Sequence, residues 1–293
     1  MRLGYACMNV ALPSKMKTCR LATYEKEGLP KIKELTLSNF TQVLDIVKWN
    51  AANDIYFFRV SSDIVPFGSH PILEWEWWMD DEVLEVTSKI KDFASDKNMR
   101  LTVHPGQYTV INSPREEVVA NAIRDLEYHA KLLDVVGGTD MILHVGGAYG
   151  DKEKAKERFC QQYMLLSNSV KDKLRLENDD KVFNVQDVLD ISKKIGIPIC
   201  FDIHHHRCNQ SLEKETADYI KEVMTTWATI GKPKMHISSG REHKTDTAHH
   251  DFIFLEDFLD FLQLLGDHDV DIMLEAKKKD QALLRLREEW QDK

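Results

Sequence analysis

Short runs of apolar and β-branched residues recur along the chain, and amphipathic stretches separate them. Each run has the length of one buried strand, and most intervals are long enough for a helix. Strand and helix alternate eight times over 293 residues with no Pro-, Gly- or Ser-rich linker, which predicts a single α/β domain, residues 1–293, folded as a (β/α)8 TIM barrel. The predicted strands are residues 2–8, 55–62, 100–106, 141–147, 173–178, 198–204, 233–240 and 271–277.

The interval between the third and fourth strands shows the helical pattern most clearly. Apolar residues recur three and four positions apart from Val118 to Leu133, and a Gly-Gly pair at 137–138 follows, as at the end of a helix. Residues 9–35 carry little apolar periodicity, and residues 63–80 contain a Trp-rich sequence. Both follow predicted strand ends, where barrels carry functional loops. We expect the Trp-rich segment to fold over the barrel rather than to stack on bases.

Composition narrows the classes of protein. A hydrophobic content of 43% supports a large core. The chain contains no run of eighteen apolar residues, which a membrane span would need, and its N-terminus lacks a secretory pattern. We therefore expect a cytoplasmic protein without a membrane partner. The five cysteines are scattered and form no CxxC pair, which argues against disulfides and a thiolate zinc site; Cys200 and Cys208 are interpreted as packing residues. A net charge of −9 gives no electropositive footprint for nucleic acid.

Metal-ligand side chains follow the pattern of strands closely. Each of the six strands from the third to the eighth ends with a histidine or a carboxylate. Strand ends converge at one face of a barrel, so these side chains should meet around a common axis. Imidazole and carboxylate without thiolate suit zinc, manganese or iron(II) better than calcium, and more than one ion is expected. The six residues are His104, His144, Glu177, Asp202, His236 and Glu275.

Three consecutive histidines, His204, His205 and His206, follow Asp202. Strict alternation along a strand would turn His204 to the same face as Asp202, whereas a strand that ends by Ile203 would allow His205 to face the site instead. The residues alone leave both choices open. His129, on the predicted helix, and His268, in a short acidic loop, are expected to be structural or solvated.

Seven motifs, in order along nearly the whole chain, resemble those of the UV damage endonuclease family. The ordered set is more specific than any single motif. The motifs are LGYACMN, VHPGQY, LHVGG, LRLEND, FDIHHHRCN, KMHISS and DTAHHDFI.

The resemblance implies a DNA repair enzyme related in fold to the endonuclease IV type of abasic-site nuclease. Its substrate would be duplex DNA carrying cyclobutane pyrimidine dimers or 6-4 photoproducts, with abasic sites as a further candidate, and no obligate protein partner is implied. Cleavage would fall immediately 5′ to the lesion and leave a 3′-hydroxyl and a 5′-phosphate. Three divalent ions are implied, with manganese first and zinc, cobalt or iron as alternatives.

The resemblance also implies roles for individual residues. Glu177 would bridge two ions; His104 and His144 would hold one, and Asp202, His236 and Glu275 the other. His205 and His249 would hold a third ion, and Lys234 would reach two ions if it carried a carboxylate modification. His70 would lie near the scissile phosphate. The residues that would probe the damaged bases are Tyr5, Asn9, Gln107 and Tyr108.

Three other functions fit parts of this pattern. An abasic-site endonuclease of the endonuclease IV type would share the metal site, and a metal-dependent sugar isomerase or epimerase would use a similar barrel on a small polyol. A nuclease needs an open groove and binds DNA in a salt-dependent way, whereas an isomerase encloses one small substrate. A barrel that binds metal or DNA without catalysis should lack a ligand, and none is missing from the sequence.

Overall fold

A closed barrel of eight parallel strands forms the centre of the protein, in a computed structural model that describes residues 1–13 and 15–291. Neighbouring strands pair in the order β1 to β8, and β8 closes on β1. All eight predicted strands and the (β/α)8 barrel are therefore confirmed. The strands are β1 (Leu3–Cys7), β2 (Phe57–Val60), β3 (Arg100–Val103), β4 (Asp140–His144), β5 (Leu174–Glu177), β6 (Ile199–Asp202), β7 (Lys234–Ile237) and β8 (Asp271–Leu274).

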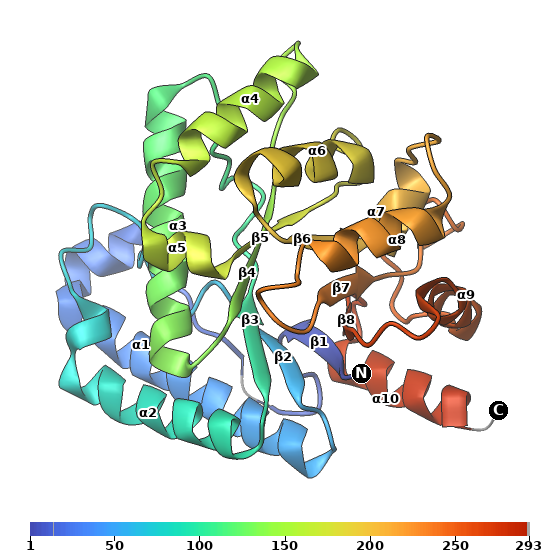
Figure 1. The fold of residues 1–293 in the computed structure, drawn as a ribbon. Helices are drawn as coiled ribbons and strands as arrows, with labels where there is room; N and C mark the ends of the chain where they lie inside the picture. Colours follow the sequence, from blue (N-terminus) through green and yellow to red (C-terminus); the bar gives the residue numbers. More distant parts are fainter. Residues whose placement is uncertain (14, 292–293) are drawn as a thin grey trace.

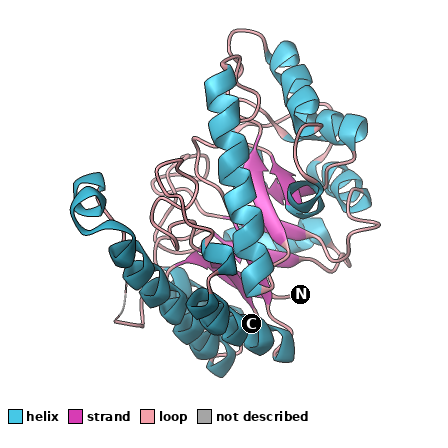
Figure 2. Ribbon diagram, turned by 90° about the vertical axis from the view of Figure 1, so that its left-hand side faces the viewer, coloured by secondary structure: helices cyan, strands magenta, loops and turns pink. Residues whose placement is uncertain are grey.

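Helices surround the strands, and the connecting loops gather beside the barrel (Figures 1 and 2). The apolar faces of the helices pack against the strands and form one large core with them. No helix in the described part of the chain is both long and apolar enough to cross a membrane. The helices are α1 (Leu21–Ala52), the 3-10 turn η1 (Trp77–Met79), α2 (Asp81–Asp96), α3 (Glu116–Val136), α4 (Lys152–Tyr163), α5 (Asn168–Lys173), α6 (Val185–Ile195), α7 (Ile203–Cys208), α8 (Thr216–Thr225), α9 (Leu255–Leu265) and α10 (Lys279–Gln291).

Two helices test the interpretation of periodicity. The helix expected between the third and fourth strands is α3, and Gly137 ends it with a left-handed φ of 73°. By contrast, α1 begins at Leu21, well before the expected end of the aperiodic segment 9–35. No side chain between residues 21 and 30 is buried, so this part of the helix needs no apolar stripe. Gly28, with a φ of 68°, kinks the helix there.

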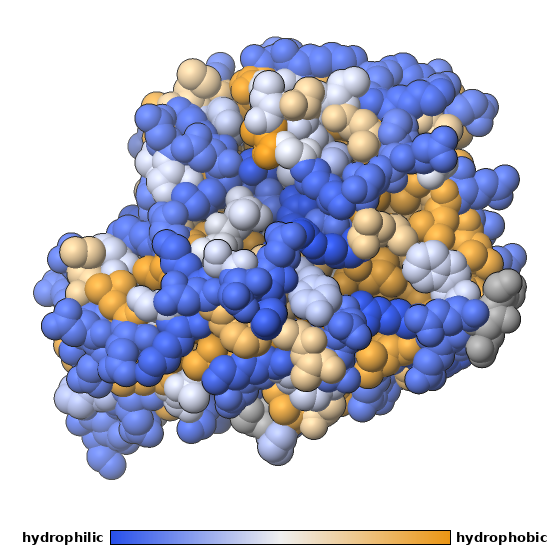
Figure 3. Space-filling model, turned by 60° about the horizontal axis from the view of Figure 1, so that its bottom comes forward, coloured by the Kyte–Doolittle hydropathy of each residue, from blue (hydrophilic) through white to orange (hydrophobic). Residues whose placement is uncertain are grey.

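The Trp-rich segment packs against the core, as expected. Trp77 is 1% exposed, and its ring centroid lies 5.6 Å from that of Tyr128 and 6.3 Å from that of Phe40. Apolar groups are thus largely drawn inward, and on the face shown in Figure 3 hydrophilic residues predominate while hydrophobic residues form separate patches.

A buried ion network closes the end of the barrel where the strands begin. Asp140 accepts hydrogen bonds from Arg100 Nε at 2.9 Å and from Arg175 Nε at 2.8 Å, and Arg100 also donates to Asp271 at 3.1 Å. The Trp227 ring covers both guanidinium groups. Burial alone would raise the pKa of Asp140, but the charges of Arg100 and Arg175 outweigh it and lower that pKa. The buried charges at this end of the barrel are therefore neutralised by one another.

We predict that Asp140→Ala lowers the free energy of unfolding by about 3–5 kcal/mol, because two buried guanidinium groups lose their shared partner. Urea unfolding followed by circular dichroism measures this loss. In the parent protein the contribution is complete above the pH at which a free aspartate ionises and is lost as the pH falls through the lowered pKa of Asp140. Asp269→Ala is the control, since the side chain of Asp269 is 60% exposed in its ion pairs. Equal stability of the two variants would contradict the prediction.

Candidate metal centre

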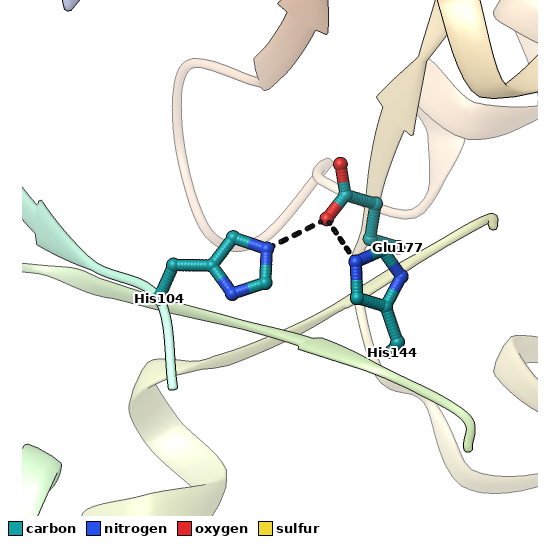
Figure 4. A group of neighbouring side chains, drawn as sticks. All are labelled: His104, His144 and Glu177. Atoms are coloured by element: carbon teal, nitrogen blue, oxygen red, sulfur yellow. Dashed lines mark hydrogen bonds and ion pairs between the residues drawn. The ribbon is translucent and has the colours of Figure 1, made fainter. Parts of the chain in front are cut away.

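Glu177 lies at the middle of a cluster of side chains where the strands end. Its Oε2 atom is 3.0 Å from His104 Nε2 and 3.3 Å from His144 Nε2, and Figure 4 shows both imidazole rings directed at this one oxygen. Its Oε1 atom is 2.6 Å from His236 Nδ1. The strand register explains the arrangement, because His144 pairs with Glu177 across β4 and β5. One carboxylate therefore contacts imidazoles from three strands.

The end of β6 decides which of the three consecutive histidines joins this cluster. The strand stops at Asp202, whose side chain caps α7 by accepting a hydrogen bond from the His205 backbone N–H at 2.8 Å. Three residues further along a helix, His205 turns back towards Asp202, and its Nδ1 atom lies 3.8 Å from both Asp202 Oδ2 and Glu177 Oε1. The condition for His205 rather than His204 to face the site is met.

The other two histidines serve the surrounding structure. His204 is fully buried, and its Nε2 atom lies 3.0 Å from the backbone oxygen of Asp246. The ring of His206 packs between Phe201 and Tyr219. His129 is buried against the backbone oxygen of Asp125, as expected of a structural residue.

Two residues that the sequence analysis missed hold ligands of this cluster in place. Asn178 is fully buried, and its side-chain amide bonds both the N–H and the C=O of Asp202 at 3.0 Å, so it fixes the backbone there. Arg59, on β2, donates to Glu275 Oε1 at 2.6 Å. The only signal for Arg59 was a charged residue inside an otherwise apolar strand.

Electrostatics divide the imidazoles into two groups. Burial lowers the pKa of His104 to about 4 and also lowers that of His236, so both are neutral near pH 7. Burial acts in the same direction on His205, but Asp202, Glu177 and Glu275 outweigh it and raise its pKa to about 9. A cation that binds beside His205 must therefore displace a proton.

The contacts of His104 indicate a shared cation. Its Nδ1 atom lies 3.0 Å from the backbone oxygen of Pro105, while its Nε2 atom lies 3.0 Å from the Glu177 carboxylate. A neutral imidazole has one N–H, so it cannot donate to both oxygens. A divalent ion between Nε2 and the carboxylate would satisfy both groups. The buried atoms Asp202 Oδ2 and His236 Nε2, which have no hydrogen-bond partner, fit the same explanation.

Among residues 1–13 and 15–291, four groups of three side chains bring their ligand atoms within 4.8 Å of one another. Together they contain the six strand-end residues of the sequence analysis and His205. Cys200 also belongs to one of them, with Glu177 and His236, because it faces the barrel interior two residues before Asp202. The interpretation of Cys200 as a packing residue is therefore incomplete: its thiol is buried, but beside the cluster.

Lys234 and His249 lie next to the same cluster. Lys234 is fully buried, its Nζ atom is 3.3 Å from Thr102 Oγ1, and burial lowers its pKa to about 8. Lys234 and His236 are two apart on β7 and share the interior face, as alternation requires. His249 Nδ1 lies 3.9 Å from Glu275 Oε2.

The residues expected to contact DNA occupy two depths. Gln107 is exposed and Tyr108 is 85% exposed, on a loop beside a cleft of about 920 Å³ that His144, His205 and His249 also line. Tyr5 and Asn9 are buried, and the Asn9 side-chain N–H donates to the Tyr5 hydroxyl. His70 is exposed and lines a neighbouring pocket with Tyr108 rather than the cluster itself.

The barrel and its cluster define a TIM barrel with a candidate multinuclear metal site at the ends of its strands. Residues 1–293 match the family model of UV-endonuclease UvdE, and the chain belongs to this family. It is 37% identical to a UV DNA damage endonuclease of Clostridium perfringens over 97% of this chain and 69% of that protein. The crystal structure of SacUVDE superposes with a TM-score of 0.91 at 35% identity and covers 100% of this chain and 98% of that chain.

A more distant likeness concerns the fold alone. Endonuclease IV from Thermus thermophilus superposes with a TM-score of 0.64 at 12% identity, over 100% of both chains. The family resemblance and the relation of the barrel to that of endonuclease IV, both expected from the motifs, are thus confirmed.

We predict that Glu177→Gln abolishes most divalent metal binding while the barrel remains folded, because the amide keeps the shape of the side chain but not its charge. The loss of Mn²⁺ affinity should exceed the roughly 10–100-fold typical of residues that only orient ligands. Electron paramagnetic resonance of free Mn²⁺ gives the affinity, and the melting temperature reports the fold.

Asp257→Asn is the matched control, because Asp257 is another buried carboxylate near the ends of the strands, but it pairs with Arg207 and Ser239 outside the cluster. It should keep the Mn²⁺ affinity of the parent. Normal Mn²⁺ affinity in Glu177→Gln would rule out Glu177 as the centre of the site.

Proposed function

We propose that this protein nicks duplex DNA immediately 5′ to UV photoproducts and leaves a 3′-hydroxyl and a 5′-phosphate. The observation that carries the proposal is the convergence of imidazoles and carboxylates on Glu177, in a chain of the UV-endonuclease family. Hydrolysis of a phosphodiester needs a neutralised phosphate and an activated water, and this cluster offers the ligands for ions that supply both. The damaged strand would lie in the cleft above it.

This proposal includes three divalent ions, with manganese as the preferred one. Glu177 would bridge two of them, His104 and His144 would hold the first, and Asp202, His236 and Glu275 the second. His205 and His249 would hold the third. Such ions would provide Lewis acidity towards the phosphate and promote ionisation of water near neutral pH.

The protein's own groups hold this arrangement. Arg59 keeps Glu275 ionised and oriented, and Asn178 positions Asp202 through its backbone. Lys234 would extend the ligand set by a carboxylate modification of its amine, which burial favours because it increases the neutral fraction of that amine. His70, which lines the neighbouring pocket with Tyr108, would contact the scissile phosphate.

Recognition of the lesion falls to the loop after β3. A crosslinked pyrimidine pair stacks weakly and costs less to extrude than normal bases. Gln107 and Tyr108 stand out from the surface and would fill the space left in the duplex. Asn9 would contact the damaged bases. Tyr5 would act through Asn9, because the Tyr5 hydroxyl accepts a hydrogen bond from the Asn9 side-chain amide.

The direct test uses an end-labelled duplex with one defined UV photoproduct, the same duplex without it, and a duplex with an abasic site. With Mn²⁺ the protein should cut the first immediately 5′ to the lesion and spare the second. Chelation should abolish cutting and added Mn²⁺ should restore it, and the rate should fall at acid pH because protonated imidazoles do not bind metal. Undiminished cutting by verified metal-free protein would overturn the metal mechanism. Cutting of the abasic duplex alone would favour an abasic-site endonuclease.

We predict that Tyr108→Ala loses about 1–3 kcal/mol of binding to photoproduct-containing DNA, the usual contribution of one base–aromatic stack. Melting temperature and Mn²⁺ content should stay unchanged, because the side chain is 85% exposed and packs on little. Fluorescence anisotropy with damaged and undamaged duplexes measures the effect. An unchanged ratio of the two affinities would remove Tyr108 from lesion recognition.

A further inference from the structure

The unpaired lysine and arginine side chains of this acidic protein are distributed unevenly between the two ends of the barrel. Most lysines and arginines pair with a carboxylate, a backbone oxygen or an aromatic ring. Within residues 1–13 and 15–291, ten cationic side chains form no ion pair, hydrogen bond or ring contact. The ten are Lys15, Lys17, Arg20, Lys26, Lys48, Arg115, Lys194, Lys277, Lys278 and Lys279.

Most of these ten side chains lie at the same end of the barrel, although they are far apart in the sequence. Seven of the ten lie between the end of a strand and the first residue of the next helix, which is the side of the candidate metal centre. Lys26 lies in the second turn of α1, near the same side. Lys48, in the last turns of α1, and Lys194, near the end of α6, lie towards the opposite side.

Six of these cations lie on two chain segments that contact each other, and we call them the β8–β1 cation group. Three follow β8 and three follow β1, strands that pair directly with each other. The two segments also touch, because Asp280 accepts hydrogen bonds from the backbone N–H groups of Val10 and Ala11. The group consists of Lys15, Lys17, Arg20, Lys277, Lys278 and Lys279.

Two members of this group lie beside a segment that borders the cleft. Lys277 and Lys278 follow Glu275 by two and three residues, and their backbone N–H groups donate to the backbone oxygens of His250 and Asp251. His249, the residue before His250, lines the cleft. Arg115 also lines it, on the loop after β3.

Three carboxylates on this side are turned inward. Asp179 accepts from the backbone N–H groups of Lys181, Val182 and Phe183, and Asp246 accepts from those of two residues in its own loop. Asp280 is itself fully buried. These three acids stabilise loops rather than pair with the unpaired cations, so they leave that positive charge available to an external polyanion.

We propose that the β8–β1 cation group, with Arg115, binds the sugar–phosphate backbone of duplex DNA on either side of the scissile phosphate, whether or not the DNA is damaged. The inference rests on the proposed function, which places that phosphate at the metal centre. Phosphate contacts position a duplex without reading its sequence, so the group would supply general affinity while the loop of Gln107 and Tyr108 supplies preference for the lesion.

The test measures the affinity of metal-loaded protein for an undamaged duplex over a range of KCl concentrations. Each phosphate contact contributes about 0.9 to the slope of log Kobs against log salt. In Lys277→Gln/Lys278→Gln the slope should therefore fall by about 1.8, so that affinity lost between 50 and 200 mM salt shrinks about tenfold. Arg115→Gln should remove about 0.9.

Lys48→Gln/Lys194→Gln is the matched control, because it removes the same charge from unpaired lysines at the other end of the barrel. Its slope should equal that of the parent. An unchanged slope in Lys277→Gln/Lys278→Gln, or an equal fall in the control, would overturn the proposal. Cutting of the photoproduct duplex by the parent is scored separately. If the parent does not cut but the slope depends on the cation group, only the proposed reaction is refuted. If the parent cuts but the slope does not depend on the cation group, only this inference is refuted.

Discussion

A carboxylate that is completely buried must be surrounded by groups that stabilise its charge, and this requirement governs the end of the barrel where the strands stop. Glu177 has exchanged water for the imidazoles of His104, His144 and His236, which come from the end of β3, from β4 and from β7. Burial would raise the pKa of Glu177, but His236 and His144 and the hydrogen bond from His104 hold it well below the usual range. The parallel register therefore has a chemical consequence, since a shift of one residue would turn these side chains away from the axis.

The two ends of the barrel satisfy the same physical requirement in different ways. Where the strands begin, Asp140 is neutralised by Arg100 and Arg175, and the network is complete within the protein. Where they end, Asp202 keeps one buried oxygen without a hydrogen-bond partner, and one nitrogen of His236 is in the same state. A complete network stabilises the fold, whereas an incomplete set of donors of this kind is suited to a cation. The division agrees with the general location of function in such barrels.

The sequence predicted the features that depend on the spacing of apolar and polar residues along strands and helices. It did not predict the features that depend on contacts between distant parts of the chain. The six candidate ligands at strand ends follow from alternation, but the choice of His205 depends on the end of β6 at Asp202 and on the helix that starts there. Arg59 was missed because a single charge in an apolar run does not indicate its partner, Glu275. The net charge of −9 argued against nucleic acid, yet a total does not say which charges are paired. In the folded chain many acids pair with lysines on outer helices or turn towards loop backbone, and the unpaired cations lie mostly beside the metal centre.

Exposure separates the two tasks of such a site. Groups that hold ions need a dry, ordered environment, and Glu177, Asp202 and His236 are accordingly buried. An aromatic ring that stacks on DNA bases, the role proposed for Tyr108, gains from being exposed before the duplex arrives, and Tyr108 is exposed. An exposed aromatic ring gains stacking energy only in the complex, so its contribution appears as binding preference rather than as stability of the free protein. Under the proposed function, lesion preference can therefore change through substitutions in the loop after β3 without disturbing the buried candidate ligands, because the loop's exposed residues contribute little to the packing beneath it.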